Sequence, residues 1–200
     1  MRLVLASGSP RRADLLRSVG IEFSVLVADI DETPAAGEPA TGFVNRMANE
    51  KCLAVQRLLA AGDRPLLPEI VVPEIVVLAA DTIVVIDGDI LGKPVDDDET
   101  RRMLRRLSGR THEVHTAVCV ATPTEIGSTT VTTTVTFATL TEADIAWYIA
   151  RGESLDKAGG YGMQTAGAVL VERIDGSPTN VIGLPLRETV VMLRSAGVAV

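Results

Sequence analysis

Apolar residues follow two different periods along this chain, and the periods mark where strands and helices are expected. Residues 75–86 are almost continuously apolar and rich in β-branched side chains, which predicts a strand buried on both faces. Residues 41–61 carry apolar side chains at helical spacing, which predicts a helix with one buried face. By the same criteria, further strands are expected at residues 3–6, 113–121, 129–140 and 169–174, and further helices are expected to begin at Pro10, near Asp96, at Thr141 and at Pro185.

Turn residues and capping residues separate these segments. Pro10 takes the first position of a predicted helix, with Ser9 before it and Gly20 at its end. Residues 123–127 contain a turn between two predicted strands, and the second strand alternates valine with threonine, which is typical of an antiparallel pair with one wet face. Helix-separated strands together with a hairpin predict an α/β fold with a mixed β-sheet. No segment resembles a linker, so residues 1–200 are predicted to form a single domain.

One short duplication interrupts this pattern. Residues 68–77 contain the pentapeptide PEIVV twice in tandem. Units this short cannot fold as supersecondary repeats, so no solenoid is predicted. We assign the duplication no function.

Charged residues interrupt the two most apolar segments. Asp81 lies inside the predicted strand at residues 75–86, where an ionised carboxylate is unfavourable unless a cation or hydrogen bonds compensate it. A catalytic or metal-bound aspartate would resolve that conflict, and an aspartate held by backbone amides at a strand end is the alternative. Lys51 falls on the apolar stripe of the predicted helix, from which its ammonium group could also reach solvent. Glu32 belongs to an acidic stretch that, in isolation, reads as a solvated loop.

A second set of residues would suit phosphate groups. The sequence SGSPRR places Ser7 between a predicted strand and a predicted helix, with Arg11 and Arg12 in the first turn of that helix. Backbone N–H groups at a helix N-terminus attract anions, although a Ser/Gly turn can also be a simple cap. Lys93 and Lys157 supply further separated cations that folding could bring to one triphosphate.

Composition narrows the range of partners. The net charge of -7 argues against broad binding to a nucleic-acid polymer, which needs clustered excess lysine and arginine.

Cys52 and Cys119 have no CxxC or Cys/His motif beside them, so neither a zinc site nor a disulfide framework is predicted. His112 and His115 would point to opposite faces of a strand, so both are expected to be structural. The amino terminus has only a brief apolar run, so we expect a cytoplasmic protein with no membrane partner.

Several segments, taken in order, resemble the Maf family of nucleotide pyrophosphatases, and the match spans nearly the whole chain. One such motif would be a weak signal, whereas the ordered set is specific. The segments are SGSPRR near the start, Glu32, Glu50-Lys51, AADT at 79–82, GKP at 92–94, LSG followed by His112, KAGGYGMQ at 157–164 and NVIGLPL at 180–186.

The resemblance implies a fold and a chemistry. It implies an elongated mixed β-sheet flanked by helices, with two lobes around a central cleft, related in architecture to the pyrophosphatases that remove inosine triphosphate. It implies that the cleft holds a nucleoside triphosphate with Mg²⁺ or Mn²⁺, and that cleavage between the α- and β-phosphates releases a monophosphate and pyrophosphate. Asp81 would be the proton acceptor, and a homodimer is plausible by the same resemblance. The residues implied around the phosphates and the metal are Ser7, Arg11, Glu32, Lys51, Asp81, Lys93 and Lys157, of which Glu32 and Asp81 would be the metal ligands.

Three positions indicate the substrate. Arg12, Thr82 and Gln164 resemble the dTTP/UTP branch of the family and differ from the branch that acts on 7-methyl-GTP. We hypothesise that the Gln164 amide pairs with the O4 acceptor and the N3–H donor of uracil or thymine and rejects the reversed pattern of cytosine. Two alternatives stay open at this point, a nucleotide-binding regulator of cell division without significant turnover and a pyrophosphatase for modified or non-standard purine triphosphates.

Overall fold

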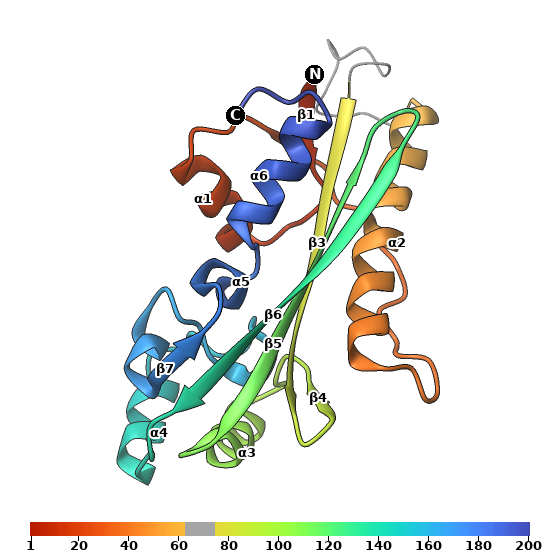
Figure 1. The fold of residues 1–200 in the computed structure, drawn as a ribbon. Coiled ribbons are helices and arrows are strands. Elements are labelled where there is room, and N and C mark those ends of the chain that lie inside the picture. The colour runs from red at the N-terminus through yellow and green to blue at the C-terminus, as the bar shows by residue number, and fades with distance from the viewer. Residues whose placement is uncertain (63–74) are drawn as a thin grey trace. The chain divides into compact units, whose positions relative to one another are not determined.

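The computed structural model describes residues 1–62 and 75–200, and most of the PEIVV duplication lies outside the described residues. Helices and strands alternate along the described chain as the apolar periods predict (Figure 1). The strands are β1 (Arg2–Leu5), β2 (Ser24–Val25), β3 (Ile75–Ile86), β4 (Asp89–Leu91), β5 (Thr111–Ala121), β6 (Ile126–Phe137) and β7 (Val171–Asp175). The helices are α1 (Pro10–Ser18), α2 (Ala40–Ala60), α3 (Asp97–Leu107), α4 (Glu142–Ile149), α5 (Pro178–Ile182) and α6 (Leu186–Ser195), with short 3-10 helices η2 (Ala158–Gly160) and η3 (Ala166–Leu170).

The strands of the described residues form one mixed sheet. Six of them follow the order β2-β1-β3-β5-β6-β7, and β4 pairs with β3. β1 is parallel to both β2 and β3, whereas β4 is antiparallel to β3 and β7 is antiparallel to β6. The prediction of an α/β fold with a mixed sheet flanked by helices is therefore confirmed.

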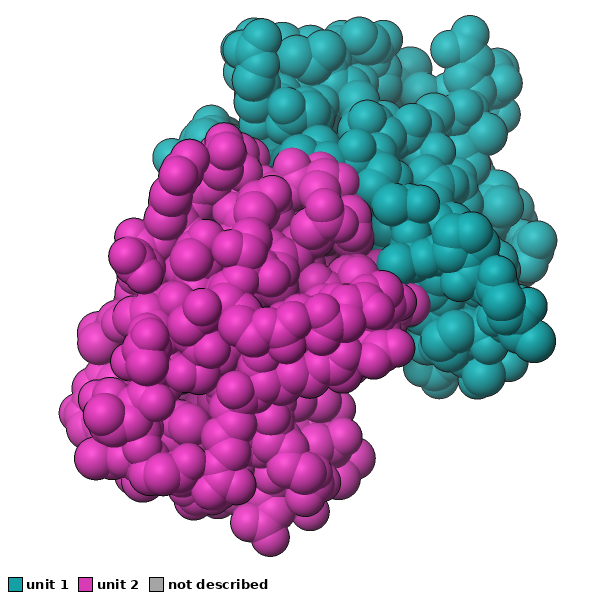
Figure 2. Space-filling model, turned by 60° about the horizontal axis from the view of Figure 1, so that its bottom comes forward, with its two compact units in different colours: residues 1–81, 116–131, 183–200 teal, residues 82–115, 132–182 magenta. Residues whose placement is uncertain are grey.

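The chain divides into two compact units, coloured separately in Figure 2. We call residues 1–81, 116–131 and 183–200 unit 1, and residues 82–115 and 132–182 unit 2. β5 and β6 contribute residues to both units, and β3 passes from one to the other between Asp81 and Thr82. The single domain over residues 1–200 and the cleft between two lobes stay predictions.

Unit 1 places its helices on both faces of its part of the sheet. α1 and α6 cover one face, while α2 lies along the other (Figure 1). Successive residues of a strand point to opposite faces, so the even-numbered residues of β3 share a face. Val76, Leu78 and Ala80 accordingly belong to the same core cluster as Leu16 of α1 and Leu193 of α6.

Unit 2 builds its core from β3, α3, α4 and a glycine-rich segment. Val84, Leu104 and Tyr148 are buried there together with Tyr161, which follows η2. The backbone N–H of Gly159 donates to the carbonyl of Gly92 at 3.0 Å. This hydrogen bond joins the segment that begins at Lys157 to the turn that carries Lys93.

Several short elements were not predicted. β2 and α5 are too brief to show a period, and β4 forms a hairpin with β3 through Asp87 (φ 56°) and Gly88 (φ 84°). Two consecutive positive φ angles are those of a type I′ turn, for which Asp-Gly is a known sequence signal. The strand predicted at residues 169–174 begins at Val171 instead, because the chain up to Leu170 forms η3.

Candidate functional site

Asp81 lies on the α2 face of the sheet because it shares parity with Val77 and Ala79. Its side chain is only 13% exposed, so the conflict expected from the sequence is real. The Lys51 ammonium group, on α2, donates to Asp81 Oδ1 at 2.7 Å. A cation from the facing helix thus compensates the carboxylate inside the apolar strand.

Lys51 also contacts a second carboxylate. Its Nζ lies 2.9 Å from Oε1 of Glu32, and the side chains of Lys51 and Glu32 are 15% and 57% exposed. One ammonium group therefore bridges a carboxylate in the sheet and a carboxylate in the loop between β2 and α2. A single positive charge neutralises only one of these two negative charges, so the group of three is anionic.

The turn after β1 brings Ser7 and Arg12 into contact. Arg12 donates from Nη1 to Ser7 Oγ at 3.0 Å and from Nε to the Gly183 carbonyl at 2.8 Å. Ser7 Oγ also accepts from the backbone N–H of Ser9 at 3.2 Å. Burial lowers the pKa of Arg12, while the nearby carboxylates of Asp81 and Glu32 act in the opposite direction.

The sheet explains why this turn lies near Asp81. β1 and β3 are parallel with Leu5 opposite Leu78, and the N–H of Ala6 donates to the Leu78 carbonyl at 2.7 Å. The carboxyl end of β1 therefore lies beside the part of β3 that leads into Asp81. In open α/β sheets, ligands characteristically bind at the carboxyl ends of parallel strands.

Unit 2 gathers three of the other predicted residues around its glycine-rich segment. Lys93 is exposed in the turn joined to Gly159, and the Lys157 and Gln164 side chains both lie against Gly162. The ammonium group of Lys157 donates to the Asp156 carboxylate at 2.7 Å and to the Glu153 carbonyl. Lys157 is thus held by its own loop, with a side chain that is 11% exposed.

The remaining two predicted residues, Arg11 and Thr82, lie next to site residues in the sequence. Arg11 is half-buried on α1 and close enough to Arg12 to lower the pKa of that guanidinium. Thr82 is half-buried in β3 directly after Asp81, and strand geometry turns it to the opposite face. Unit 1 therefore contains Ser7, Arg11, Arg12, Glu32, Lys51 and Asp81, and unit 2 contains Thr82, Lys93, Lys157 and Gln164.

The chemistry of Glu32 and Asp81 fits a divalent cation of the Mg²⁺ type. Both are carboxylates, both approach one cationic group, and such hard ions prefer oxygen ligands. Within residues 1–62 and 75–200, no three His, Cys, Asp or Glu side chains form a metal-binding group. An ion of the Mg²⁺ type commonly takes one or two protein carboxylates and completes its shell with phosphate oxygens and water.

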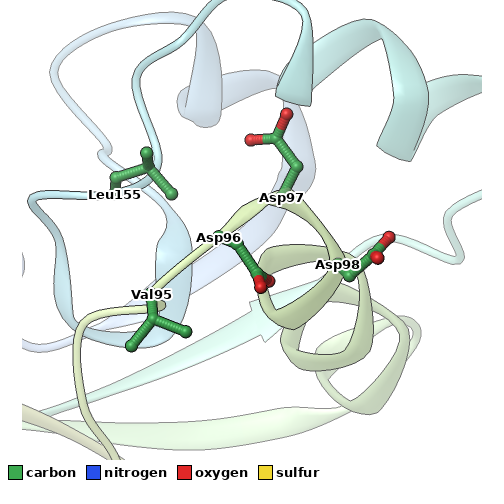
Figure 3. A pocket seen from close by; sticks show the side chains of 5 residues that line it. All are labelled: Val95, Asp96, Asp97, Asp98 and Leu155. Carbon is green, nitrogen blue, oxygen red and sulfur yellow. The ribbon is translucent and has the colours of Figure 1, made fainter.

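A pocket elsewhere in unit 2 does not suit a triphosphate. It measures about 450 Å³ and is lined by Val95, Leu155 and the acidic residues 96–98 at the start of α3. Figure 3 shows the three carboxylates pointing in different directions. The Asp96 side chain caps α3 by accepting from the N–H of Glu99 at 2.7 Å, so a structural role accounts for it.

The two histidines have separate partners, as their strand parity predicts. His112 Nε2 lies 2.8 Å from the Tyr161 hydroxyl, and His115 Nδ1 lies 2.8 Å from Thr132 Oγ1. Burial lowers the pKa of His112 to about 4. Neither arrangement brings the two rings together.

Sequence reasoning assigned no role to Gly183, whose carbonyl holds the Arg12 guanidinium. It lies in the segment NVIGLPL, so the only signal was the position of this glycine in a motif. Its φ of +122° is one that other residues rarely adopt, which ties the carbonyl orientation to glycine.

Comparisons with known proteins identify the relatives of this chain. The sequence model of the Maf family, described as "Maf-like protein", matches residues 2–196. A protein of Hahella chejuensis named dTTP/UTP pyrophosphatase is 48% identical over 199 residues, covering 100% of this chain and 94% of its own length. A protein of the same name from Anaeromyxobacter dehalogenans (strain 2CP-1) is also 48% identical, covering 98% of this chain and 94% of its own length.

One solved structure has a distantly similar fold. The Ham1 protein of Staphylococcus aureus superposes with a TM-score of 0.42 and 14% identity over 69% of this chain and 72% of that chain, a likeness too low to carry an argument. Among the described residues, no helix is both long and apolar enough to cross a membrane.

Proposed function

Since the chain belongs to the Maf family, we propose that it hydrolyses nucleoside triphosphates, with dTTP and UTP as the favoured substrates. The products are the nucleoside monophosphate and pyrophosphate, from cleavage between the α- and β-phosphates. The name shared by its relatives of 48% identity supports this activity.

The observation that carries the proposal is the anionic group of Asp81, Glu32 and Lys51. A buried ion pair such as that of Lys51 and Asp81, which is 13% exposed, could be replaced as a whole by apolar residues at little cost to the fold, so its presence points to a chemical use. A protein that only senses a triphosphate would gain nothing from two carboxylates beside an anionic ligand unless they hold a metal, so release of pyrophosphate separates the two functions. Hydrolysis by activated water does require such a group.

We assign the phosphates to the turn after β1. Backbone N–H groups at the start of α1 favour phosphate oxygens, because the first turn of a helix has unsatisfied donors and the positive end of the helix dipole. Arg11 and Arg12 add charge there, and the Ser7–Arg12 hydrogen bond of 3.0 Å keeps one guanidinium oriented.

Asp81 acts as the proton acceptor. It takes a proton from a water molecule, and that oxygen attacks the α-phosphorus while the bond to the bridging oxygen breaks. Glu32 and Asp81 would hold Mg²⁺ or Mn²⁺, which when bound supplies positive charge that neutralises the triphosphate. Lys51 orients Asp81 through the 2.7 Å contact.

The charge that develops on the leaving pyrophosphate needs further cations. Lys51, Lys93 and Lys157 are proposed to stabilise it, since preorganised positive groups are most effective where negative charge appears in the transition state. Lys157 would exchange its contact with Asp156 for phosphate oxygens. That exchange replaces one ion pair by another.

Base recognition is assigned to Gln164, with Thr82 and Arg12 as the other residues that favour a pyrimidine. The amide of Gln164 offers one donor group and one acceptor, which match O4 and N3–H of uracil or thymine. A homodimer also stays a prediction, which measurement of the mass in solution will test.

A substrate panel tests the proposed function. The enzyme is incubated with dTTP, UTP, CTP, 7-methyl-GTP or ITP in the presence of Mg²⁺ or Mn²⁺, and pyrophosphate and orthophosphate are measured separately. We expect pyrophosphate from dTTP and UTP at the highest kcat/KM, with no orthophosphate. Hydrolysis of dTTP in ¹⁸O-labelled water should place the label in dTMP, because attack occurs at the α-phosphorus.

The other readings predict different results. A regulator binds triphosphate and releases no pyrophosphate. A pyrophosphatase for altered purine nucleotides prefers ITP or 7-methyl-GTP. Release of orthophosphate with a nucleoside diphosphate contradicts the proposed bond cleavage.

A further inference from the structure

Glu32 lies in a segment that has no regular secondary structure. Residues 26–39 connect β2 to α2, and Glu32 itself is 57% exposed, so packing against the core does not fix its side chain. The segment also contains Gly37 at φ +73°, a residue with wide conformational freedom. Some other contact must hold the loop if Glu32 is to stay beside Lys51.

Arg46 of α2 makes that contact. Its Nε donates to Glu38 Oε1 at 2.8 Å and its Nη2 donates to Glu38 Oε2 at 2.7 Å, a bidentate pair. The same Nη2 donates to the carbonyl of Thr33 at 3.1 Å. Paired hydrogen bonds of this kind are strong and fix direction as well as distance. Arg46 therefore binds both Glu38, at the end of the loop, and Thr33, the residue next to Glu32.

The loop is arranged to present these acceptors. Glu38 Oε2 also accepts from the N–H of Ala35 at 3.0 Å, and Asp31 Oδ1 accepts from the N–H of Thr33 at 2.9 Å. The hydrogen bonds with Arg46 lower the pKa of Glu38 to about 2, so the pair is ionised at neutral pH. Glu38 is thus shared between the helix and the loop.

We propose that Arg46 is a positioning residue that holds Glu32 beside Lys51 and Asp81 by fastening residues 26–39 to α2. Arg46 and Lys51 lie five positions apart on one helix, so the loop anchor and the cation that Glu32 contacts move as one body. The consequence for catalysis rests on the proposed function. A displacement of about 1 Å in a reacting group can cost about 10²-fold in rate.

Amide hydrogen exchange tests the anchor without any turnover. In Arg46→Met, the N–H groups of Thr33 and Ala35 should exchange faster than in the unmodified protein. Arg57→Met is the matched control, because Arg57 is an exposed arginine near the end of the same helix, and it should leave both amides unchanged. Unchanged exchange in Arg46→Met would overturn the proposal.

A double-mutant cycle tests whether the anchor acts through Glu32. Arg46→Met should lower kcat/KM for dTTP by about 10- to 100-fold in the unmodified enzyme. In a Glu32→Gln background it should lower kcat/KM by less than about threefold, because the group it positions is already gone. Arg46→Lys should recover only part of the loss, because an ammonium group keeps the positive charge but cannot form the bidentate pair. An equal loss in both backgrounds contradicts the proposed role.

A second variant keeps the test decisive. Glu38→Gln weakens the anchor from the loop side, and it should reproduce both effects of Arg46→Met even if the arginine variant folds poorly. If the unmodified enzyme releases no pyrophosphate, the proposed function fails, and the exchange comparison alone decides whether Arg46 holds the loop.

Discussion

Lys51 is the residue whose ammonium group contacts both carboxylates of the site. Its side chain is 15% exposed and that of Asp81 is 13% exposed, so both charges are largely removed from water. The attraction between such a pair offsets its desolvation only when the geometry is good, and removal of one partner leaves the other unpaired. The contacts of 2.7 Å to Asp81 and 2.9 Å to Glu32 meet that condition.

Substitution of Gln164 tests base recognition. A glutamate at this position can accept from N3–H of uracil but cannot donate to O4, so Gln164→Glu should lower kcat/KM for UTP by about 10- to 100-fold. The N4 amino group of cytosine can donate to the new carboxylate, so CTP should lose less. Competition between UTP and CTP measures the ratio, with Met163→Leu as the control in the same segment. An unchanged ratio would remove Gln164 from base recognition.

Single residues were predictable where their character conflicts with their surroundings. Asp81 and Lys51 are charged side chains at apolar positions, and the structure brings them into contact. Arg46 and Glu38 carry no such signal, because charged residues near a loop and on a helix surface are ordinary. Their contact depends on how residues 26–39 fold back, which no local pattern predicts.

At the scale of elements, the strand β3 and the glycine-rich segment determine where functional residues lie. β3 alternates its side chains between the face covered by α1 and α6 and the face covered by α2, and this parity puts Asp81 opposite Lys51. In unit 2, Gly162 gives the aliphatic chain of Lys157 a surface to lie on. An ideal Cβ at Gly162 would come within 2.7 Å of Lys157 Cδ.

Two glycine substitutions should separate function from stability. Gly162→Ala comes too close only to the flexible Lys157 side chain and makes an ordinary contact of 3.5 Å with Gln164 Oε1, so it should displace the Lys157 ammonium group and lower kcat/KM while the unfolding midpoint changes little. Gly167→Ala places its Cβ 2.6 Å from the backbone oxygen of Gly162, which cannot move freely, and should destabilise the protein by about 1–3 kcal/mol.

Urea unfolding and pyrophosphate release measured on both variants provide the comparison. If Gly162→Ala and Gly167→Ala lost the same stability, the expectation that the Lys157 side chain moves to make room would be contradicted. Normal activity in Gly162→Ala would show that the position of Lys157 does not matter for turnover.

The longer elements were predictable because each buries a periodic face. β3 has the predicted bounds, and α2 differs by one residue at each end. β2 comprises only Ser24 and Val25, so its pairing with β1 is a tertiary effect without a sequence period. β4 could have been found from the Asp87-Gly88 turn signal.

At the scale of the whole molecule, the charge distribution limits the partners. The net charge of -7 disfavours long anionic polymers, while unit 1 keeps Arg11 and Arg12 together at the start of α1. A small anion can use such a local group where a polymer would meet the surrounding negative charge. Buried polar groups also make the stability of the fold depend on pH.

Stability should fall in mild acid because of His112. Burial lowers its pKa in the folded protein to about 4 from an ordinary value of 6.5, so between these values the unfolded chain binds more protons. The free energy of unfolding should therefore decrease as the pH falls from about 6.5 to 4, by about 3 kcal/mol in total. Urea denaturation at pH 7.5 and pH 4.5 measures this change, and His112→Gln should flatten the dependence, which separates the histidine from carboxylates that also titrate near pH 4.5. If His112→Gln kept the same dependence of the unfolding free energy on pH, other groups would be its cause.

The proposed mechanism is tested most sharply by the single-turnover rate of pyrophosphate release from dTTP in Asp81→Asn, compared with the unmodified enzyme under saturating Mg²⁺ or Mn²⁺. Asparagine has nearly the same shape and cannot accept the proton from water, so the folded variant should bind dTTP yet lose about 10²- to 10⁴-fold in rate. An Asp81→Asn enzyme that keeps near-normal rates would contradict the central role of this carboxylate.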